Sequence, residues 1–327
     1  MLSYDWVKII LTIAGLIVVW AFIFSATSTK ITAAQQFSVY NYRGNNNLSR
    51  EFYDNLEKGF KKDNIFSYEV IETDPYDFVT VGKDTNTVLT ARSGVGEGDV
   101  IFLSPEFDTN TQYKEEGTDE IKYKSTYAQT FTQNYYYNIF HFDQNEDGSF
   151  TEDSFFGQME SYLSPFFDGD LKNGTLNEKK AEEHFRARIK KNGDKRFKTK
   201  KQIEQGIEWE NERLNKYRDA LLETYGYFEE GLIKTESYTI ADAFDETKKI
   251  THAYTLNICP NEKKAENLKN IVSYQTTYTD ENGETQPKNT AENMNVAFFN
   301  YPKYVEKGFA YESLLYINFV IRSSLTA

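Results

Sequence analysis

An acidic loop in the middle of the chain has the spacing of a calcium-binding site. Its oxygen-bearing side chains stand at alternate positions, namely Asp143, Asn145, Asp147 and Ser149. Alternate oxygen ligands wrap around a hard cation and Gly148 permits the sharp turn, so the run resembles the first eight positions of an EF-hand loop. The twelfth position is Ser154 instead of the usual bidentate glutamate, which leaves an ordinary acidic turn as the alternative. Ca²⁺ at this loop is the one cofactor that the sequence suggests.

A strongly basic stretch follows farther along the chain. Residues 186–201 carry nine basic residues and one acidic residue, a net +8 that leaves −21 on the rest of a chain whose formal charge is −13. The basic residues are Arg186, Arg188, Lys190, Lys191, Lys195, Arg196, Lys198, Lys200 and Lys201. Such a patch suits lipid headgroups, a wall polymer or an acidic partner, and the solvated tip of a helical hairpin is the alternative. The acidic remainder argues against a nucleic-acid partner.

Complete catalytic motifs are missing from the sequence. The three histidines, His141, His184 and His252, are far apart along the chain, and His184 has no HExxH partner. Cys259 is the single cysteine, which excludes an intramolecular disulfide and a cysteine-based zinc cluster. The glycines at 94, 96 and 98 precede a predicted strand instead of following one, so they do not form a phosphate loop. We therefore expect no enzyme.

An uncharged segment near the start separates a short tail from the body. Residues 9–26 contain no charge, and an 18-residue helix covers about 27 Å, close to the hydrocarbon thickness of a bilayer. We expect residues 1–8 to form a cytoplasmic tail, 9–27 an uncleaved single-pass transmembrane helix and 28–36 a linker. A signal peptide cleaved near Ala26 is the alternative. Charge bias hardly decides the orientation, and we expect the body to be extracytoplasmic.

The body begins with alternating strand and helix patterns. Strands are predicted at 37–42, 65–71 and 99–103, and helices at 48–62 and 86–93. Strands and helices that alternate in this way form a parallel sheet with right-handed crossovers, so the fold class is α/β.

The second half is richer in helices. Helices are predicted at 127–142, 153–167, 178–191 and 200–225, with a turn at 192–193 between the last two. Strands are predicted at 251–258 and 295–299, a helix running into a strand at 262–276, a turn at 280–283 and a closing apolar helix at 309–323.

The stretch from 37 to 103 resembles the first half-lobe of extracellular solute-binding proteins of the type II periplasmic-binding-protein class. It contains FSVYNY, LSREFYDNLEKGF, FSYEVIE, TVLTARSGVGEG and DVIFLSPE, and the late ESLLYINFVIRSS resembles the C-terminal helix of such lobes. The resemblance implies two lobes, a ligand cleft between them and delivery to an ABC importer. Lobe 1 would comprise 37–125 plus about 290–327, and a helix-rich lobe 2 would comprise 126–289. Here a membrane helix replaces the lipoprotein cysteine that is usual in the Gram-positive members.

Ligands of open parallel sheets bind beyond the carboxyl ends of the strands. The residues expected there are Asn41, Tyr42, Arg43, Glu72, Thr73, Asp74, Ser104, Glu106, Asn300 and Tyr301. Arg43 would hold an anionic group and Tyr42 would stack on a ring.

Two functions follow from the sequence. The first is a membrane-tethered extracytoplasmic solute-binding module that presents its ligand to an ABC permease or another membrane protein. The alternative is a membrane-anchored scaffold or adaptor that docks a partner or an anionic envelope surface through the basic hairpin.

Overall fold

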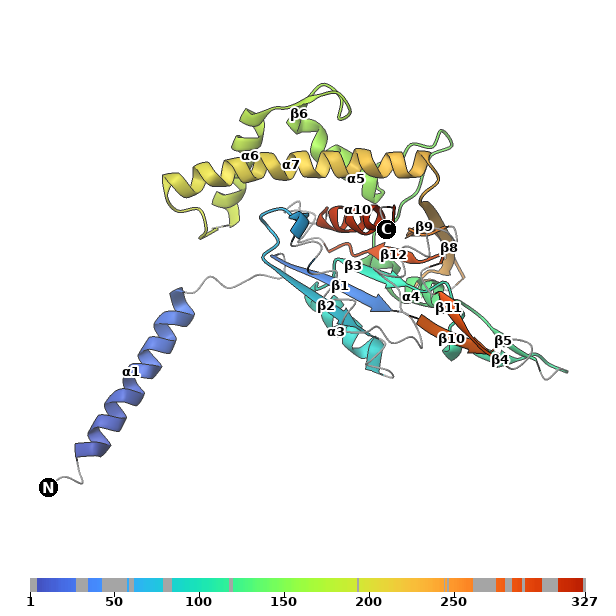
Figure 1. The fold of residues 1–327 in the computed structure, drawn as a ribbon, viewed down its shortest axis with the longest axis horizontal. Helices are drawn as coiled ribbons and strands as arrows, with labels where there is room; N and C mark the ends of the chain where they lie inside the picture. The colour runs from blue at the N-terminus through green and yellow to red at the C-terminus, as the bar shows by residue number, and fades with distance from the viewer. Residues whose placement is uncertain are drawn as a thin grey trace.

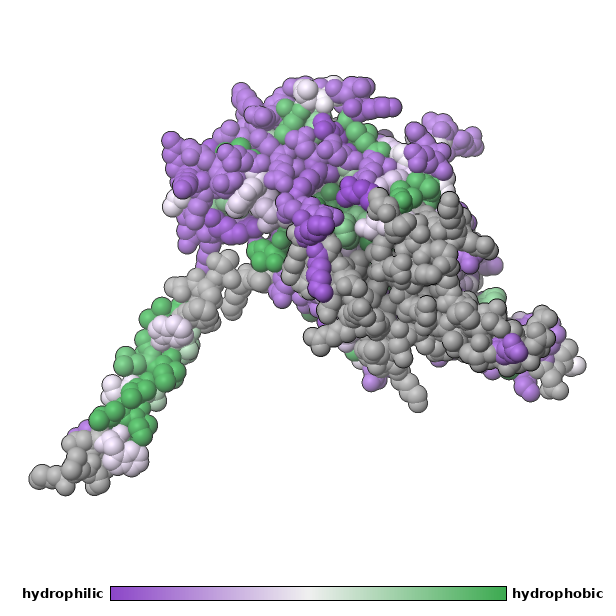
Figure 2. Space-filling view, viewed as in Figure 1, coloured by the Kyte–Doolittle hydropathy of each residue, from purple (hydrophilic) through white to green (hydrophobic). Residues whose placement is uncertain are grey.

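The computed structural model describes residues 5–27, 35–42, 58, 62–78, 84–117, 120–192, 194–243, 245, 247–260, 275–279, 284–289, 292–301 and 311–325. The first element is helix α1, Asp5–Thr27, whose window Trp6–Ile23 has a mean hydropathy of 2.3 and no buried residue. Figure 2 shows this helix as an apolar rod, whereas the coloured upper part of the body is mostly hydrophilic. Its length and composition allow α1 to cross a membrane or to serve as a signal sequence.

A six-stranded sheet lies at the centre of the body, in the order β2-β1-β3-β12-β9-β8 (Figure 1). Strand β1, Gln36–Tyr42, pairs in parallel with β2, Glu72–Asp77, and with β3, Val100–Leu103. Between β2 and β3 lies helix α3, Thr85–Val95, which ends at Gly96 in the left-handed conformation that favours glycine. The strands predicted at 37–42 and 99–103, the helix predicted at 86–93 and the α/β class are confirmed.

The strand predicted at 65–71 is wrong, because that stretch forms turns and the strand beside β1 is β2. Pro75 lies within β2 and made this strand hard to predict. A proline is tolerated there because β2 is at the edge of the sheet and has a neighbour on one side only. The side chains of 65–71 bind distant helices instead, as Glu69 does with Arg188.

The rest of the sheet makes it mixed instead of wholly parallel. Strand β12, Asn295–Phe298, is antiparallel both to β3 and to β9, Lys249–Asn257. Strand β8, Lys234–Ala241, which was not predicted, pairs antiparallel with β9. The strands predicted at 251–258 and 295–299 are confirmed. Strands β8 and β9 come from the segment assigned to the second lobe, yet they join the sheet of the first, and the two-lobed division stays a prediction.

Helices pack on both faces of this sheet. Successive residues of a strand point to opposite faces, and accordingly Phe37 of β1 contacts Tyr316 of α10, Glu312–Leu325, whereas Tyr42 contacts Phe131 of α4, Tyr127–Tyr135. Helix α7, Lys200–Glu229, packs on α10, and α5, Phe155–Leu163, and α6, Glu178–Asn192, pack on α7 (Figure 1). Helix α7 therefore bridges the buried α10 and the outer α6.

Most of the predicted helices are confirmed. Helices α6 and α7 match the predictions at 178–191 and 200–225, and α10 matches 309–323 from residue 312 onward. Helices α4 and α5 are shorter than predicted, since α4 gives way to a 3₁₀ turn at Tyr136–Asn138 and α5 to one at Ser164–Phe166. The helix predicted at 48–62 lies almost wholly outside the described residues, as do the helix within 262–276 and the turn at 280–283.

Three two-stranded ribbons complete the described fold. They are β4, Gln112–Lys114, with β5, Ile121–Tyr123; β6, Phe167–Asp168, with β7, Thr175–Leu176; and β10, Gln275–Thr279, with β11, Thr285–Asn289.

Candidate functional site

Some of the predicted ligand residues lie at the carboxyl ends of β1 and β3. Asn41 and Ser104 are fully buried there, and Tyr42 is 9 % exposed, with its ring centroid 5.6 Å from that of Phe131. Burial raises the pKa of the Tyr42 hydroxyl. Glu106, two residues after Ser104, is half-buried, and its backbone N–H donates to the Ser104 hydroxyl over 3.1 Å. The side chains of Asn41, Tyr42 and Ser104 thus belong to the packed interior.

Five other predicted ligand residues lie at the opposite, amino end of β1 and β3. Glu72, Thr73 and Asp74 belong to β2 and stand beside Gln36 to Ser38, at the amino end of β1. Asn300 and Tyr301 follow β12, which is antiparallel to β3, so they reach the amino end of β3, where the Tyr301 hydroxyl donates to the Glu97 carbonyl over 3.4 Å. Arg43 lies outside the described residues. The described members of the set are therefore divided between the carboxyl and the amino ends of β1 and β3 and do not form one site.

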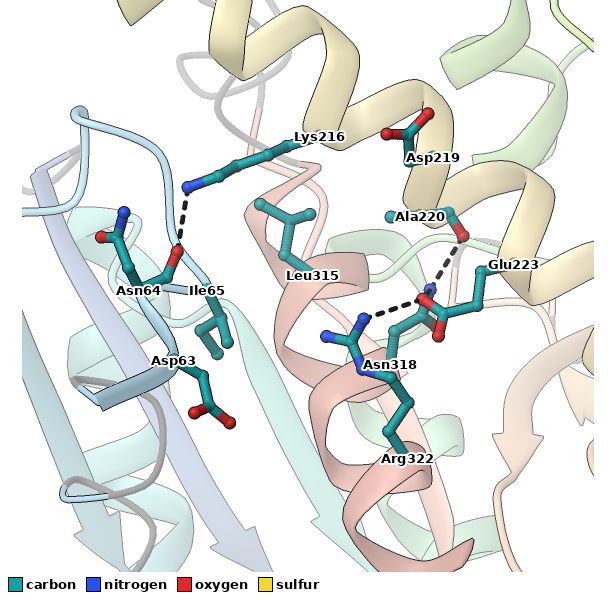
Figure 3. A pocket seen from close by; sticks show the side chains of 10 residues that line it. All are labelled: Asp63, Asn64, Ile65, Lys216, Asp219, Ala220, Glu223, Leu315, Asn318 and Arg322. Carbon is teal, nitrogen blue, oxygen red and sulfur yellow. Dashed lines mark hydrogen bonds and ion pairs between the residues drawn. The ribbon is translucent and has the colours of Figure 1, made fainter. Parts of the chain in front are cut away.

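A cavity of about 460 Å³ lies between α7, α10 and the turn before β2 (Figure 3). It is lined by Asp63, Asn64, Ile65, Lys216, Asp219, Ala220, Glu223, Leu315, Asn318 and Arg322. Lys216 donates to the carbonyls of Asn64 and Phe66 over 2.9 and 3.0 Å, and Arg322 lies 3.4 Å from Glu223. The lining therefore carries both signs of charge, and part of that charge is already paired.

A buried ionic cluster fastens α6 and α7 to the 65–71 turn. Glu210, with no exposed side-chain surface, accepts hydrogen bonds from Arg188 over 2.9 Å and from Arg213 over 2.7 and 3.0 Å. Glu69, equally buried, accepts one from Arg188 over 2.6 Å. Tyr68 donates to Glu210 over 2.9 Å and accepts a short hydrogen bond from Arg188. Residues from three segments are thus joined by charge-assisted hydrogen bonds away from water.

Electrostatics within the cluster favours the charged forms. Burial alone would raise the pKa of Glu210, but Arg213 and Arg188 outweigh it and hold that pKa well below the ordinary 4.5. The pKa of Glu69 is lowered in the same sense, because Arg188 and Arg196 outweigh the effect of its burial.

Two members of the predicted basic patch belong to this cluster, which corrects the view of residues 186–201 as one solvated surface. Arg188 is 8 % exposed, and Arg196 lies 2.7 Å from both Glu69 and Asp194. Their charges are used inside the molecule because carboxylates from distant segments meet them there.

The other seven basic residues of the patch are exposed around the turn between α6 and α7. They are Arg186, Lys190, Lys191, Lys195, Lys198, Lys200 and Lys201, called the basic tip below. Arg186 and Lys200 have weak surface partners one turn away, Glu182 and Glu204. The basic tip thus retains most of the predicted positive charge.

The start of α7 is unusual for its charge. Thr199 caps the helix in a reciprocal capping box with Gln202, and the first turn then carries Lys200 and Lys201 and no acidic residue. The amino end of a helix already bears partial positive charge, so lysines there oppose helix stability. Their placement concentrates positive potential at one point of the surface.

The predicted calcium loop is held by its own side chains. Asp147 accepts hydrogen bonds from the Ser149 backbone and hydroxyl over 2.9 and 2.6 Å, and these bonds lower the pKa of Asp147. The Asn145 amide donates to the Ser149 hydroxyl over 2.9 Å. Asp143 faces away, toward β9, where it accepts from the Ala253 backbone over 2.7 Å. Calcium binding at this loop stays a prediction.

Asp143 instead lies beside the rings of His141 and His252, with one carboxylate oxygen close to Nδ1 of each. His141 Nδ1 is 3.2 Å from Asp143 Oδ2, and His252 Nδ1 makes a short hydrogen bond to the same oxygen. The two ring centroids are 4.9 Å apart. All three side chains are partly buried, and their ligand atoms lie within 4.8 Å of one another. Two imidazoles and a carboxylate at this spacing can hold a metal ion.

No known protein family, curated protein or solved structure matches this chain. The resemblance to solute-binding proteins therefore stays an expectation. The His141–Asp143–His252 cluster was missed in the sequence because 109 residues separate Asp143 from His252. The HFD order of residues 141–143 was the only local signal, since in an extended chain it places a histidine and an aspartate on one side.

Proposed function

We propose that this protein is a membrane-anchored adaptor whose basic tip rests on the anionic headgroups of the membrane that holds α1. The exposed positive charge of the basic tip, beside the point where the chain enters the body, supports this proposal. Helix α1 supplies the anchor. The sheet and its helices form the body that is held close to the membrane surface.

The basic tip and the start of the body are neighbours. The backbone N–H of Ile71 donates to the Gln35 carbonyl over 2.8 Å, so the 65–71 turn lies beside the first described residue of the body. Glu69, two residues earlier and hence at most about 7 Å away along the chain, is paired with Arg196 at the base of the tip. In Figure 1 the turn between α6 and α7 lies on the side where β1 begins.

The linker keeps this side of the body close to the anchor. Eight residue steps from Thr27 to Gln35 span at most about 28 Å even when fully extended. Each lysine or arginine near an anionic membrane contributes about 1 kcal/mol, so the seven residues of the tip contribute several kcal/mol together. Such an interaction also relieves the repulsion between Lys200, Lys201 and the amino end of α7.

The test measures the distance of the basic tip from the bilayer. A fluorophore is placed on the full chain at Ala187→Cys, an exposed site on α6, while the buried Cys259 stays unlabelled. The chain is reconstituted into nanodiscs whose headgroups carry an acceptor. Energy transfer should be higher with phosphatidylglycerol than with phosphatidylcholine. It should fall when salt rises from 0.1 to 1 M, which shortens the Debye length from about 10 to about 3 Å.

Matched charge reversals complete this test. Glutamate at Lys195, Lys198, Lys200 and Lys201 should remove the lipid-dependent difference, whereas glutamate at four exposed lysines elsewhere, Lys114, Lys172, Lys248 and Lys249, should preserve it. Equal energy transfer on both lipids, or an equal effect of both variants, would reject the proposal. Acidic residues at positions 200 and 201 favour the helix dipole by about 0.3–1 kcal/mol each, so a loss of docking is not explained by unfolding.

Binding of a small solute is the second candidate function, and the cavity in Figure 3 favours it. Its volume of about 460 Å³ is in the range of ligand pockets, and its lining offers acids such as Asp63 and Asp219 beside the base Arg322. A zwitterion such as a free amino acid suits that mixture. A panel of amino acids should then raise the melting temperature of the full chain, and Asp219→Asn should weaken the rise. No shift with any of them would exclude this candidate.

A further inference from the structure

Three side chains of the kinds that bind metals, His141, Asp143 and His252, meet at the start of the loop that precedes α5. This cluster is independent of the basic tip. His141 and Asp143 are two residues apart, and His141 Nδ1 lies 3.2 Å from Asp143 Oδ2, so both side chains point to the same side. Phe142 between them points into the core, with its ring centroid 5.4 Å from that of Phe298. The backbone of Phe142 donates to the Ala253 carbonyl over 2.6 Å, which places His252 of β9 next to the pair.

The nitrogen of His141 that faces this cluster lacks a satisfactory partner. Its Nδ1 atom is buried from solvent and makes no hydrogen bond to any residue that the structure describes, although it lies 3.2 Å from Asp143 Oδ2. That oxygen is already engaged by His252 Nδ1. A cation between the three atoms would engage both nitrogen lone pairs and the carboxylate at once.

Neighbouring groups orient two of the three ligands for this role. The other nitrogen of His141, Nε2, lies 3.6 Å from Asp153 Oδ2, and a small shift would let Nε2–H donate to that carboxylate while Nδ1 ligates a metal. Asp153 is itself held by the Thr151 hydroxyl over 2.7 Å. Asp143 Oδ1 accepts from the Ala253 backbone, which fixes the carboxylate and directs Oδ2 toward the histidines.

We propose that His141, Asp143 and His252 bind a first-row divalent transition metal, Zn²⁺ in the first instance, through Nδ1, Oδ2 and Nδ1. Imidazole nitrogen with one carboxylate suits Zn²⁺ and its neighbours in the series, whereas Ca²⁺ takes oxygen ligands. The side chains of His141, Asp143 and His252 are 20 %, 25 % and 37 % exposed, so solvent reaches part of each of the three residues. Three protein ligands leave the fourth position of a tetrahedral Zn²⁺ to water, which is the ligand count of catalytic or exchangeable zinc centres.

The test uses the full chain in detergent after removal of metal by EDTA. Zn²⁺ is titrated against a chromogenic chelator, and Co²⁺ is added separately for its visible absorption. The wild type should bind one Zn²⁺ per chain, and excess Ca²⁺ should not displace it. His252→Gln and Asp143→Asn should each weaken binding by more than 100-fold. Asp153→Asn should weaken it about 10- to 100-fold as the loss of an orienting group does.

The third histidine of the chain provides the matched control. His184→Gln lies outside the cluster and should bind Zn²⁺ as the wild type does. Circular dichroism of each metal-free variant verifies that it is folded. If Asp143→Asn does not fold, His252→Gln still tests the site, because His252 is 37 % exposed and tolerates substitution better. The proposal is overturned if the wild type does not take up Zn²⁺, if His252→Gln binds as tightly as the wild type, or if His184→Gln loses as much.

Discussion

The buried ionic cluster predicts a large and local effect of Glu210→Gln. Glu69, Asp194 and Glu210 balance Arg188, Arg196 and Arg213 within the cluster. The substitution keeps the shape of the side chain and removes one negative charge where no exposed surface admits water. Removing one partner of a buried ion pair costs about 3–5 kcal/mol, because the remaining charge stays desolvated and uncompensated.

Glu212→Gln is the matched control, since it makes the same change on the same helix two residues away. Glu212 is 53 % exposed and pairs with Lys216 over 2.9 Å, so its loss should cost only about 0.3–0.5 kcal/mol. The two variants thus separate a buried charge from a surface charge. They share helix, residue type and neighbouring sequence.

Urea unfolding of the full chain in detergent measures both variants. The fluorescence of Trp209 reports the contact of α7 with the 65–71 turn, because its ring stacks on that of Tyr68 with centroids 5.6 Å apart. Glu210→Gln should lower the free energy of unfolding by about 3–5 kcal/mol and the melting temperature by roughly 6 °C or more. A loss below about 1 kcal/mol, or one no larger than that of Glu212→Gln, would refute the idea that this cluster holds α6 and α7 to the body.

Three further predictions follow from the same structure. Folding lowers the pKa of Glu210 below 4.5, so the charged side chain stabilises the fold above that pH and loses this effect as pH falls through the folded pKa. The difference in unfolding free energy between wild type and Glu210→Gln should therefore shrink below pH 4.5. Gly206→Ala would place a Cβ 2.4 Å from the Phe185 ring, and thermal unfolding should show a loss of roughly 1–3 kcal/mol, whereas an unchanged melting temperature would contradict that packing. Mass spectrometry of the membrane-bound protein should find α1 retained, and a chain beginning near residue 27 would identify a signal sequence instead.

Local patterns in the sequence predicted the elements whose structure is decided locally. Helices α6 and α7 follow from their charged, helix-favouring residues, and β1 and β3 from short buried runs, which is why these elements were found with nearly correct ends. For residues 65–71 the local pattern predicted a strand where the structure has turns. Ser67 binds Glu312, 245 residues away, and Glu69 binds Arg188, 119 residues away, so partners invisible to a local window decide its conformation.

In the candidate sites, too, locally encoded features were predictable and features set by distant partners were not. The basic tip was predictable because a run of charge is a local property, but the burial of Arg188 and Arg196 was not, since the carboxylates of Glu69 and Glu210 come from elsewhere. The expected ligand residues are divided because β12 runs antiparallel and carries Asn300 to the amino end of β3, and because Glu72 to Asp74 begin β2 instead of following a strand. Strand direction depends on the whole topology and leaves no mark in a short segment.

Lysine footprinting shows without any substitution whether the basic tip rests on the membrane. The full chain in nanodiscs is treated with an amine-reactive reagent, and modification of each lysine is measured by mass spectrometry. The lysines of a docked tip should be protected on phosphatidylglycerol relative to phosphatidylcholine, namely Lys190, Lys191, Lys195, Lys198, Lys200 and Lys201. Lys172, Lys248 and Lys249 should react equally on both lipids. Equal reactivity of the tip lysines on the two lipids at low salt would contradict docking of the tip.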